Sequence, residues 1–569
     1  MVMFKRPKKT VETVETLPTG ADTDNARLPD KNGLETHNEK CRPEGTTNDT
    51  NDTNEMMPDR EKNGARPPIF SSTWKEIICI FLLALSPVLE ALTTGALLVA
   101  LDKIGQSYKI EGGQLSWTLS AFSLGTGSSL LIMAGLADSF GRKKTLIAGY
   151  TVFAATSLIS GFMKNDVAFD VLRAIQGVAT GAAIPASVGI LGSIYRKPSK
   201  RKNRAMAGFA AGAPLGFVVG LVVGGICGEF IGWQGILFFF AIMYFLAALA
   251  CVWYVPPDPP MSKPEVIEKL KNLDYGGAAL CLAGFTLFVF AMTHADSTEK
   301  GWKTPYIIGL FVTGFVLIVL FVLYECYIAS NPIMPPHIWK CKGFAVCMAC
   351  VALGMSTFLG TTQFYITMYF QNIKGTNPIL TTAYFVPMVV AGICVNVFAA
   401  MTLHLIPGRF LMMLAQAGFF GAALLMALVG VHTSYWAIPF PAEILSVIGA
   451  DLLYNVSTLL TINSVSEDLQ SRAAGIFNTI AMLSAAVALA AASSIASAKV
   501  SADETHKVSK ETLLDSYHAA FWFSVGTSAA GLVLSFFLNL GTSGGDEGKD
   551  VDQDTEEVET DSITGVNNN

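Results

Sequence analysis

Long apolar runs separated by short polar segments fill the chain from Lys75 to about residue 540. A helix needs roughly 20 apolar residues to cross a bilayer. Runs of this kind lie near 77–101, 115–137, 145–163, 168–195, 205–228, 234–255, 275–293, 305–328, 343–370, 380–403, 409–430, 435–460, 473–497 and 517–540. The pattern therefore predicts an all-α integral membrane protein with about fourteen transmembrane helices.

The order of the runs predicts three parts between two polar tails. Six runs lie within 75–256, two lie within 257–330, and six lie within 331–541. Residues 1–74 mix charges of both signs with Thr, Asn and Pro, and residues 542–569 are acidic. Neither tail has enough apolar side chains to form a core, so we expect both tails to be disordered.

Composition agrees with a membrane protein. Of the 569 residues, 51% are hydrophobic and 15% are charged, against about 25% charged in an ordinary globular domain. The mean hydropathy is +0.45. Cys79, Cys227 and Cys281 lie inside apolar runs, and we interpret them as packing thiols. The CxxC of Cys347 and Cys350 is also apolar and has no His beside it, so we expect no metal site there.

Cations in the short loops predict the orientation. RKPSKRKNR at 196–204, GRKK at 141–144 and PGR at 407–409 all follow even-numbered runs. Short loops rich in Lys and Arg stay in the cytoplasm, so we expect both tails to be cytoplasmic. The expected home is the plasma membrane, with the vacuole or another internal membrane as the alternative.

Two motifs in the first part indicate a family. In GLADSFGRKKTL at 135–146, membrane anchoring explains the cations but does not explain Asp138. The pattern L-x-D-x-x-G-R-K-x-x-L resembles the signature loop of the major facilitator superfamily, with departures at Ala134 and Ser139. FDVLRAIQGVATGAAIP at 169–185, which contains Arg173 and Gln176, resembles the second motif of that family.

Two further segments resemble one branch of the family. GFAAGAPLGFVVGLVVGGICGEFIGW at 208–233 is similar to the Gly- and Pro-rich motif of its antiporters, although Ala213 separates Gly212 from Pro214. DLQSRAAGIFNTIAML at 468–483 and the six-two-six grouping resemble the fourteen-helix drug:proton antiporters. Among fungal members, the sequence is similar to aminotriazole-resistance proteins, boron exporters and toxin exporters.

The resemblance implies the major facilitator fold and a transport function. Two six-helix bundles would enclose a small-molecule substrate, and they would rock to expose it alternately on each side of the lipid bilayer. A proton gradient would drive export of drugs, toxins or secondary metabolites. The expected protein is a monomer without a cofactor or metal, is not an enzyme, and does not bind nucleic acid.

The loop motif implies a conformational gate formed by Asp138, Gly141, Arg142 and Lys143. Asp138 would pair with Arg142 or meet the N-terminus of a neighbouring helix in one transport state only, because a helix dipole attracts an anion there. The alternative is an ordinary polar residue at the end of a helix.

Glycines in the antiporter-like segment recur every four residues and therefore share one helix face. They are Gly208, Gly212, Gly216, Gly220 and Gly224. Small residues at this spacing let two helices approach closely, and Pro214 favours a bend. A static packing face explains the spacing as well as a moving seam does, and the family resemblance favours the seam.

Ionisable residues inside the runs are the candidates for proton coupling, since each costs at least ~2.5–3.5 kcal/mol at a helix centre. Glu90 lies mid-run, and its alternative role is structural, held by Thr93 or Thr94. Arg173 is a candidate that an Asp170 ion pair would instead make structural. Asp451 is the deep acid of its run, and we expect Glu443, two turns earlier, to be interfacial.

Polar and aromatic residues at membrane depth are candidates for a substrate cavity. They include Gln363, Tyr365, Asn396 and Asn455. Hydrogen bonding between helices is the alternative role for the amides. A lipid-facing or packing stripe is the alternative for the aromatic group, which is Phe358, Phe364, Tyr365 and Tyr369.

Three other functions remain open from the sequence. A carrier for small inorganic solutes, such as borate or ammonium, would have a narrow cavity. A channel would need a continuous polar stripe, which the runs do not show. A non-transporting membrane sensor would use its long tails to signal.

Overall fold

The computed structural model describes residues 67–110, 112–195, 200–258, 262–295, 298, 301–341, 343–402, 405–465, 470–500 and 509–538. Nearly all of both predicted tails, and residues 196–199 of the basic loop, lie outside the described residues.

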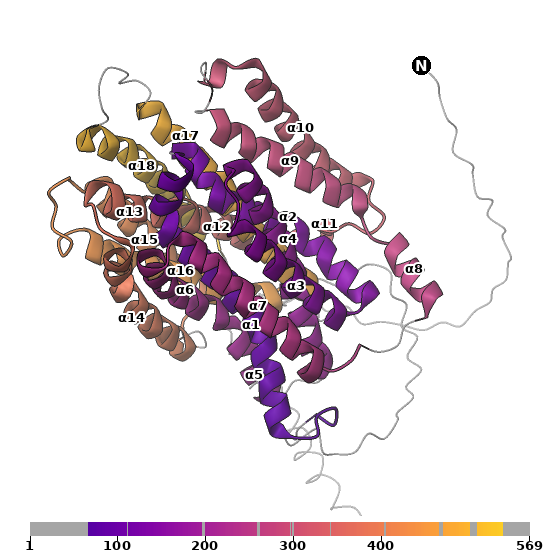
Figure 1. The fold of residues 1–569 in the computed structure, drawn as a ribbon. Coiled ribbons are helices and arrows are strands. Elements are labelled where there is room, and N and C mark those ends of the chain that lie inside the picture. The colour runs from indigo at the N-terminus through magenta and orange to yellow at the C-terminus, as the bar shows by residue number, and fades with distance from the viewer. Residues whose placement is uncertain are drawn as a thin grey trace, which may run out of the picture. The chain divides into compact units, whose positions relative to one another are not determined.

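The described residues are helical, and the helices follow the predicted runs (Figure 1). The first half, residues 67–258, holds α1 (Thr73–Tyr108), α2 (Gly112–Phe140), α3 (Arg142–Ser160), α4 (Asp166–Ile194), α5 (Lys200–Ala210), α6 (Gly212–Phe230) and α7 (Trp233–Tyr254). The insert holds α8 (Lys263–Lys271), α9 (Tyr275–His294), the short η3 (Gly301–Lys303) and α10 (Pro305–Tyr327).

The second half, residues 331–538, holds the remaining elements. They are α11 (Pro336–Trp339), α12 (Phe344–Thr357), η4 (Phe358–Thr362), α13 (Gln363–Met368), η5 (Tyr369–Ile373), α14 (Pro378–Thr402), α15 (Gly408–Ala427), α16 (Pro439–Asn463), α17 (Gln470–Val500) and α18 (Lys510–Ser535). The predicted run near 343–370 is one α-helix interrupted by two π-helical segments, η4 and η5.

Length and composition support twelve of the fourteen predicted membrane spans in the described part of the chain. Every predicted run is helical, but in the described part of the chain 12 helices are long and apolar enough to cross a membrane. α3 and α18 are not among these twelve. The physical reason is polarity, because α3 begins with Arg142, Lys143 and Lys144, and the apolar stretch of α18 is interrupted by Ser, Thr, Gly and His residues, as in SYHAAFWFSVGTSAAG at 516–531. The count of fourteen therefore remains a prediction.

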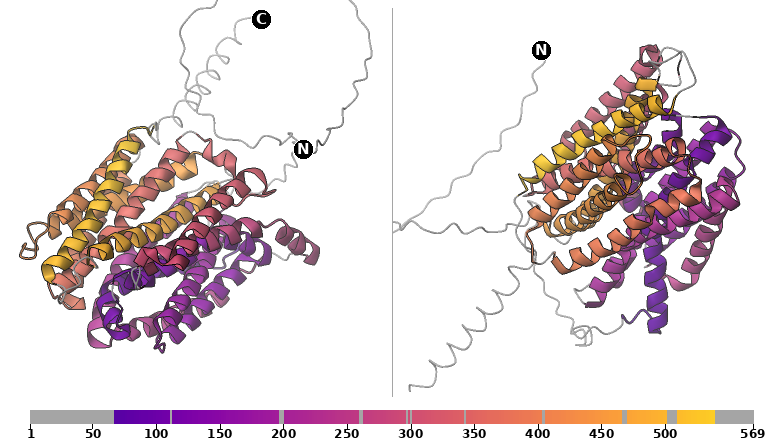
Figure 2. Two further views of the ribbon diagram at one scale, coloured as in Figure 1. Left: turned by 90° about the horizontal axis from the view of Figure 1, so that it is seen from above. Right: turned by 90° about the vertical axis from the view of Figure 1, so that its left-hand side faces the viewer.

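Each half packs mainly with itself, and the halves meet along two helix pairs. In the first half α1 packs on α6, and α4 packs on both α2 and α3; in the second half α15 packs on α16 and α18. α2 contacts α17, and α6 contacts α14, across the halves. The insert helix α9 packs against α10, α2 and α17 (Figure 2).

Apolar side chains on the outer surfaces suit a lipid environment. Val312, Phe315, Val319 and Val322 of α10 are all exposed. A soluble protein rarely exposes such a continuous apolar surface, whereas a bilayer requires one.

Candidate functional site

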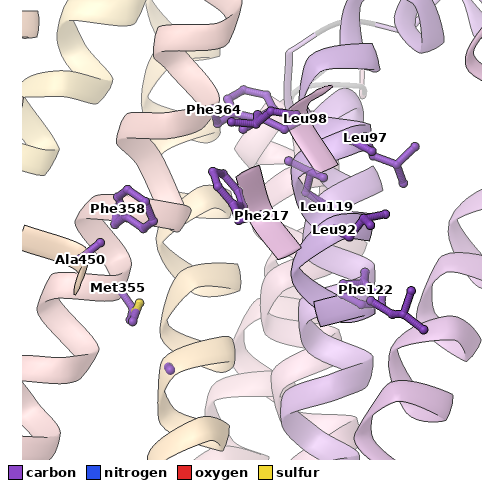
Figure 3. Packing of buried hydrophobic residues seen from close by; sticks show 14 of the residues in the cluster. Leu92, Leu97, Leu98, Leu119, Phe122, Phe217, Met355, Phe358, Phe364 and Ala450 are labelled. Atoms are coloured by element: carbon purple, nitrogen blue, oxygen red, sulfur yellow. The ribbon is translucent and has the colours of Figure 1, made fainter. Parts of the chain in front are cut away.

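A small cavity lies where the two halves meet. Its volume is about 30 Å³, and its polar lining is Thr94, Ser120, Ser123 and Gln363. This space holds about two water molecules, far less than the roughly 300–1,000 Å³ of a drug-sized pocket. Phe217 of α6 lines the cavity and faces Phe358 of η4, with ring centroids 6.2 Å apart (Figure 3).

Only one of the predicted cavity residues lines this space. Gln363 is there, whereas Tyr365, Asn396 and Asn455 are not. The Tyr365 ring instead packs against Tyr517 and Phe521 of α18. The four candidate aromatic side chains are all buried, so they form a packing stripe, as one form of the alternative expected, and they do not face lipid.

Hydrogen bonds join the halves at the end of the molecule where α1 ends, which we call the closed end. The Gln371 amide donates to Val99 O at 2.6 Å and accepts from the Asp102 N–H at 3.4 Å. The other bonds are Thr382 to Leu221 O at 2.9 Å, Asn377 to Glu229 at 3.1 Å and Ser116 to Ser493 at 3.1 Å. Toward the opposite end, the contact between α2 and α17 includes Leu131 against Gly475 and is apolar.

The predicted gate lies at that opposite end. Arg142 Nε pairs with Asp138 Oδ1 at 2.7 Å, as one of the two predicted arrangements requires. Arg142 also donates to Gly189 O of α4 at 2.6 Å. The Asp138 side chain is 56% exposed, so the pair itself contributes little stability. Whether it breaks during transport remains a prediction.

Asp258, which the sequence analysis did not identify, binds the same loop as the predicted gate residues. Its carboxylate accepts the Lys143 N–H at 2.9 Å and the Lys144 N–H at 3.3 Å. It thereby neutralises the N-terminus of α3, where two orphan donors and the helix dipole favour an anion. Gly141, at φ +110°, leaves space for the Asp258 carboxylate, because a Cβ at this position would collide with it. The sequence feature that could have identified Asp258 is a single acid in VPPDPP, directly after a predicted membrane span.

The glycine face packs on the backbone of α1. A Cβ on Gly216 would collide with Val88 O, and one on Gly220 would collide with Leu92 O. Gly208 is not part of this contact, since nothing lies within 4 Å of its Cβ position. The run divides at Ala211 into α5 and α6, and Pro214 lies in the first turn of α6. The close approach is present, and its movement remains a prediction.

Glu90 is buried in α1, with 8% of its surface exposed. The structural alternative for this residue is wrong in its stated form. The Thr93 hydroxyl donates to Leu89 O at 2.7 Å, and the Thr94 hydroxyl donates to the backbone oxygen of Glu90 at 3.2 Å. Neither threonine therefore holds the carboxylate. Thr94, one turn on, lines the cavity.

Arg173 is fully buried at the centre of a polar cluster in the first half. Its guanidinium donates to Gln176 Oε1 at 2.6 Å and to Thr118 O at 3.3 Å, and it lies 4.5 Å from the Phe122 ring centroid. The ion pair with Asp170, which was the structural alternative for Arg173, is absent, and Asp170 instead accepts a hydrogen bond from the Thr118 hydroxyl. The fold thus gives two of the guanidinium nitrogens neutral partners and leaves Nη2 buried without a hydrogen-bond partner.

The position of Glu443 differs most clearly from the one predicted from the sequence. We expected it at the interface, yet its side chain is 0% exposed, and neither carboxylate oxygen has a hydrogen-bond partner. One turn later, Ser446 accepts a hydrogen bond from Gln363 Nε2 at 3.2 Å. Gln363 Oε1 is also buried and without a partner. Gln363, which lines the cavity, is also the side chain that interacts with the Glu443 carboxyl.

Asp451 forms a second polar cluster with two of the predicted amides. Asn396 donates to Asp451 Oδ2 at 2.8 Å, and Asn455 donates to Asn396 Oδ1 at 3.0 Å. These groups join α14 to α16, which is the bridging role that we gave as the alternative. Because they lie outside the cavity lining, a direct contact with substrate is not part of this arrangement.

At its N-terminus, α1 is tied to the rest of the first half by a buried acid. Glu76 accepts from the Tyr195 hydroxyl at 2.6 Å and pairs with Arg201 at 2.7 Å. Burial, together with the Glu76 contact, raises the pKa of the Tyr195 phenol well above its usual range. The phenol therefore acts as a hydrogen-bond donor that links α4 to α1.

Candidate metal ligands do not gather in the described part of the chain. No group of three or more His, Cys, Asp or Glu side chains there is arranged to hold an ion. Cys347 and Cys350 are buried free thiols.

Comparisons with known proteins place this arrangement in a family. Residues 83–489 match the Major Facilitator Superfamily. The chain is 31% identical to the low affinity ammonium transporter of Saccharomyces cerevisiae, covering 78% of this chain and 84% of that protein. It is 30% identical to efflux pump terG of Aspergillus terreus, covering 78% and 83%.

A solved structure agrees with the fold. A bacterial homologue of the human lysosomal transporter Spinster, in an inward-facing and occupied conformation, superposes with a TM-score of 0.54. It is 11% identical and covers 82% of this chain and 97% of that one. The family predicted from the loop and helix motifs is confirmed: the chain is a multi-span membrane protein of the Major Facilitator Superfamily.

Proposed function

We propose that the chain is a proton-coupled antiporter that exports small toxic molecules, such as drugs, toxins or secondary metabolites, by alternating access. It would work as a monomer in the plasma membrane, with both termini in the cytoplasm and without a cofactor or metal. One charge moving through 100 mV supplies ~2.3 kcal/mol, and ~1.4 kcal/mol corresponds to tenfold. A single proton would then sustain a gradient of roughly fortyfold.

The observation that carries this proposal is the buried Glu443 carboxyl without a partner. An ionised carboxylate in such a place costs several kcal/mol, whereas a neutral carboxyl group costs far less. Glu443 would therefore be protonated in this state and would release its proton when the halves move. Glu90 and Asp451 would be further proton-binding groups, and Arg173 would hold the helices of the first half in position.

Similarity to a fungal efflux pump supports the export of organic molecules. For such a substrate the cavity must widen, and the hydrogen bonds at the closed end support one way in which this would happen. With Gln371, Thr382 and Asn377 holding one end, the halves would part at the end that carries the Asp138–Arg142 pair. The gate residues Gly141 and Lys143 would move together with the Asp138–Arg142 pair.

A carrier for small inorganic solutes is the second candidate. Two observations favour it: the cavity is only about 30 Å³, and one relative bears the name of a low affinity ammonium transporter. The same gate and proton site would serve such a solute without a large cavity.

Purified protein in liposomes, given a pH step and a panel of labelled solutes, tests both candidates. The panel should include a hydrophobic cationic dye, borate and methylammonium. We expect dye movement that depends on the pH step and that falls in Glu90→Gln, with the exposed Glu265→Gln as the matched control. Movement of methylammonium or borate alone, unaffected by excess dye, would establish the second candidate instead.

A further inference from the structure

A pair of carboxylates lies where the insert meets the chain leading to the second half. Asp274 caps α9, and its Oδ1 accepts the Gly277 N–H at 2.7 Å. Glu325 lies in the last turn of α10, and its Oε2 accepts the Met334 N–H at 2.9 Å. One oxygen of each carboxylate is thus fully occupied by the backbone, and the pair connects α9, α10 and the segment before α11.

The other two oxygens point at the same space. Asp274 Oδ2 and Glu325 Oε1 are both buried and have no hydrogen-bond partner, and Glu325 is 5% exposed. A Cβ on Gly277 would lie 2.5 Å from each of these oxygens. The two atoms are therefore separated by at most twice that distance, and the missing side chain of Gly277 leaves the space between them open.

Among the described residues no Lys, Arg or His forms an ion pair with either carboxylate, and the side chains that interact with Asp274 are Glu325 and Tyr324. The titratable neighbours are Cys281, which faces Glu325 from α9, and Tyr324, whose hydroxyl lies against Gly276. The neighbouring helices α2 and α17 present apolar side chains to the insert, including Leu124 and Leu483. On α8, Lys269 is paired with Glu265.

Two ionised carboxylates at this separation, away from water, repel each other strongly. Pairs of this kind in proteins hold one proton between them. A calcium or magnesium ion is a poor occupant, because it takes six or more oxygen ligands, and the pair offers two free oxygens. We propose that Asp274 and Glu325 share one proton, forming a proton-binding site in the insert that is separate from the coupling groups of the two halves.

This site would make the contact between the insert and the segment before α11, here called the joint, weaker or stronger according to pH. With the proton in place, the O–H of one carboxyl donates to the other, and Glu325 keeps its bond to Met334. Removing the proton leaves two like charges facing each other, so the joint weakens as the pH rises. The inference does not depend on which solute the chain carries.

Infrared difference spectroscopy of the full-length protein in detergent tests the proposal. We expect a protonated-carboxyl band near neutral pH in the wild-type-minus-variant difference spectra of both Glu325→Gln and Asp274→Asn, whereas the band of Glu443 is common to all samples and cancels. Each substitution supplies an amide N–H to the remaining carboxylate, which then ionises. The exposed Glu265→Gln is the matched control, and its difference spectrum should lack the band.

The pH dependence of thermal stability provides a second readout. Between mildly acidic and mildly alkaline pH, the wild-type melting temperature should fall further than that of Glu325→Gln. Difference spectra that show no protonated-carboxyl band for either variant would overturn the proposal. So would a wild-type spectrum in which that band appears only after a chelator removes bound metal, since the occupant would then be a metal ion.

Discussion

Arg173 in the first half and Glu443 in the second are both completely shielded from solvent, but their surroundings differ. Arg173 donates to Gln176 and Thr118 and lies over the Phe122 ring. Glu443 has no hydrogen-bond partner on either oxygen. A charge with partners can stay permanently ionised, whereas a carboxyl without them favours a proton. The comparison suggests that the first half holds its buried charge for structure and the second half for proton exchange.

The largest effect should come from Glu443→Gln. Glutamine mimics the neutral carboxyl and cannot release a proton, so we expect flux driven by a pH gradient to fall by about two orders of magnitude. Thermal stability should stay the same or rise, because the substitution removes an acid without partners. The exposed Glu511→Gln is the matched control. A variant with normal gradient-driven flux would contradict the role of Glu443.

Arg173→Met should act on stability instead. It leaves Gln176 and Thr118 with unsatisfied buried atoms, so we expect a loss of about 2–4 kcal/mol in unfolding free energy. Thermal melting in detergent measures this loss. If gradient-driven flux disappears while melting is unchanged, Arg173 belongs to the proton path, and the contrast between the halves fails.

Gly216→Ala should disturb the contact between α1 and α6. The added methyl group would collide with Val88 O, and overpacking of this kind costs typically about 1–3 kcal/mol. Gly208→Ala is the control, since nothing lies within 4 Å of its Cβ position. Equal melting temperatures for the two variants would show that α1 and α6 are packed less closely at Gly216 than the structure indicates.

The gate should show the smallest change in stability. Asp138→Asn removes an exposed ion pair worth about 0.2–1 kcal/mol, and Asp258→Asn weakens a helix N-terminus by about 1 kcal/mol. We expect a turnover rate several times lower for Asp258→Asn, because α3 loses its anchor. Stopped-flow dye efflux measures this rate. Unchanged turnover in both variants would mean that this loop is not a gate.

The sequence predicted the positions of the helices and the family, because runs of apolar residues and the spacing of Asp138, Gly141 and Arg142 are local features. It did not predict that Glu443 is fully buried. Two turns separate Glu443 from Asp451, and this spacing cannot show that Gln363 of α13 lies beside the earlier residue. The π-helical segments beside Gln363 likewise have no simple sequence signal.

Contacts between distant segments were the other part that sequence reasoning missed. The bonds from Gln371 to Val99 and from Lys143 to Asp258 join residues more than a hundred positions apart. Periodicity along one helix cannot identify such partners. The alternative pairing of Arg173 with Asp170 failed for the same reason, because Thr118 from α2 binds both side chains.

The most direct test of the central claim compares two kinds of transport in the same liposomes, with wild type and Glu443→Gln. One is accumulation of labelled solute driven by a pH gradient, and the other is exchange of labelled for unlabelled solute at equal pH. The account predicts that the variant keeps exchange and loses gradient-driven accumulation. Accumulation at the wild-type rate, or an equal loss of both activities, would contradict it.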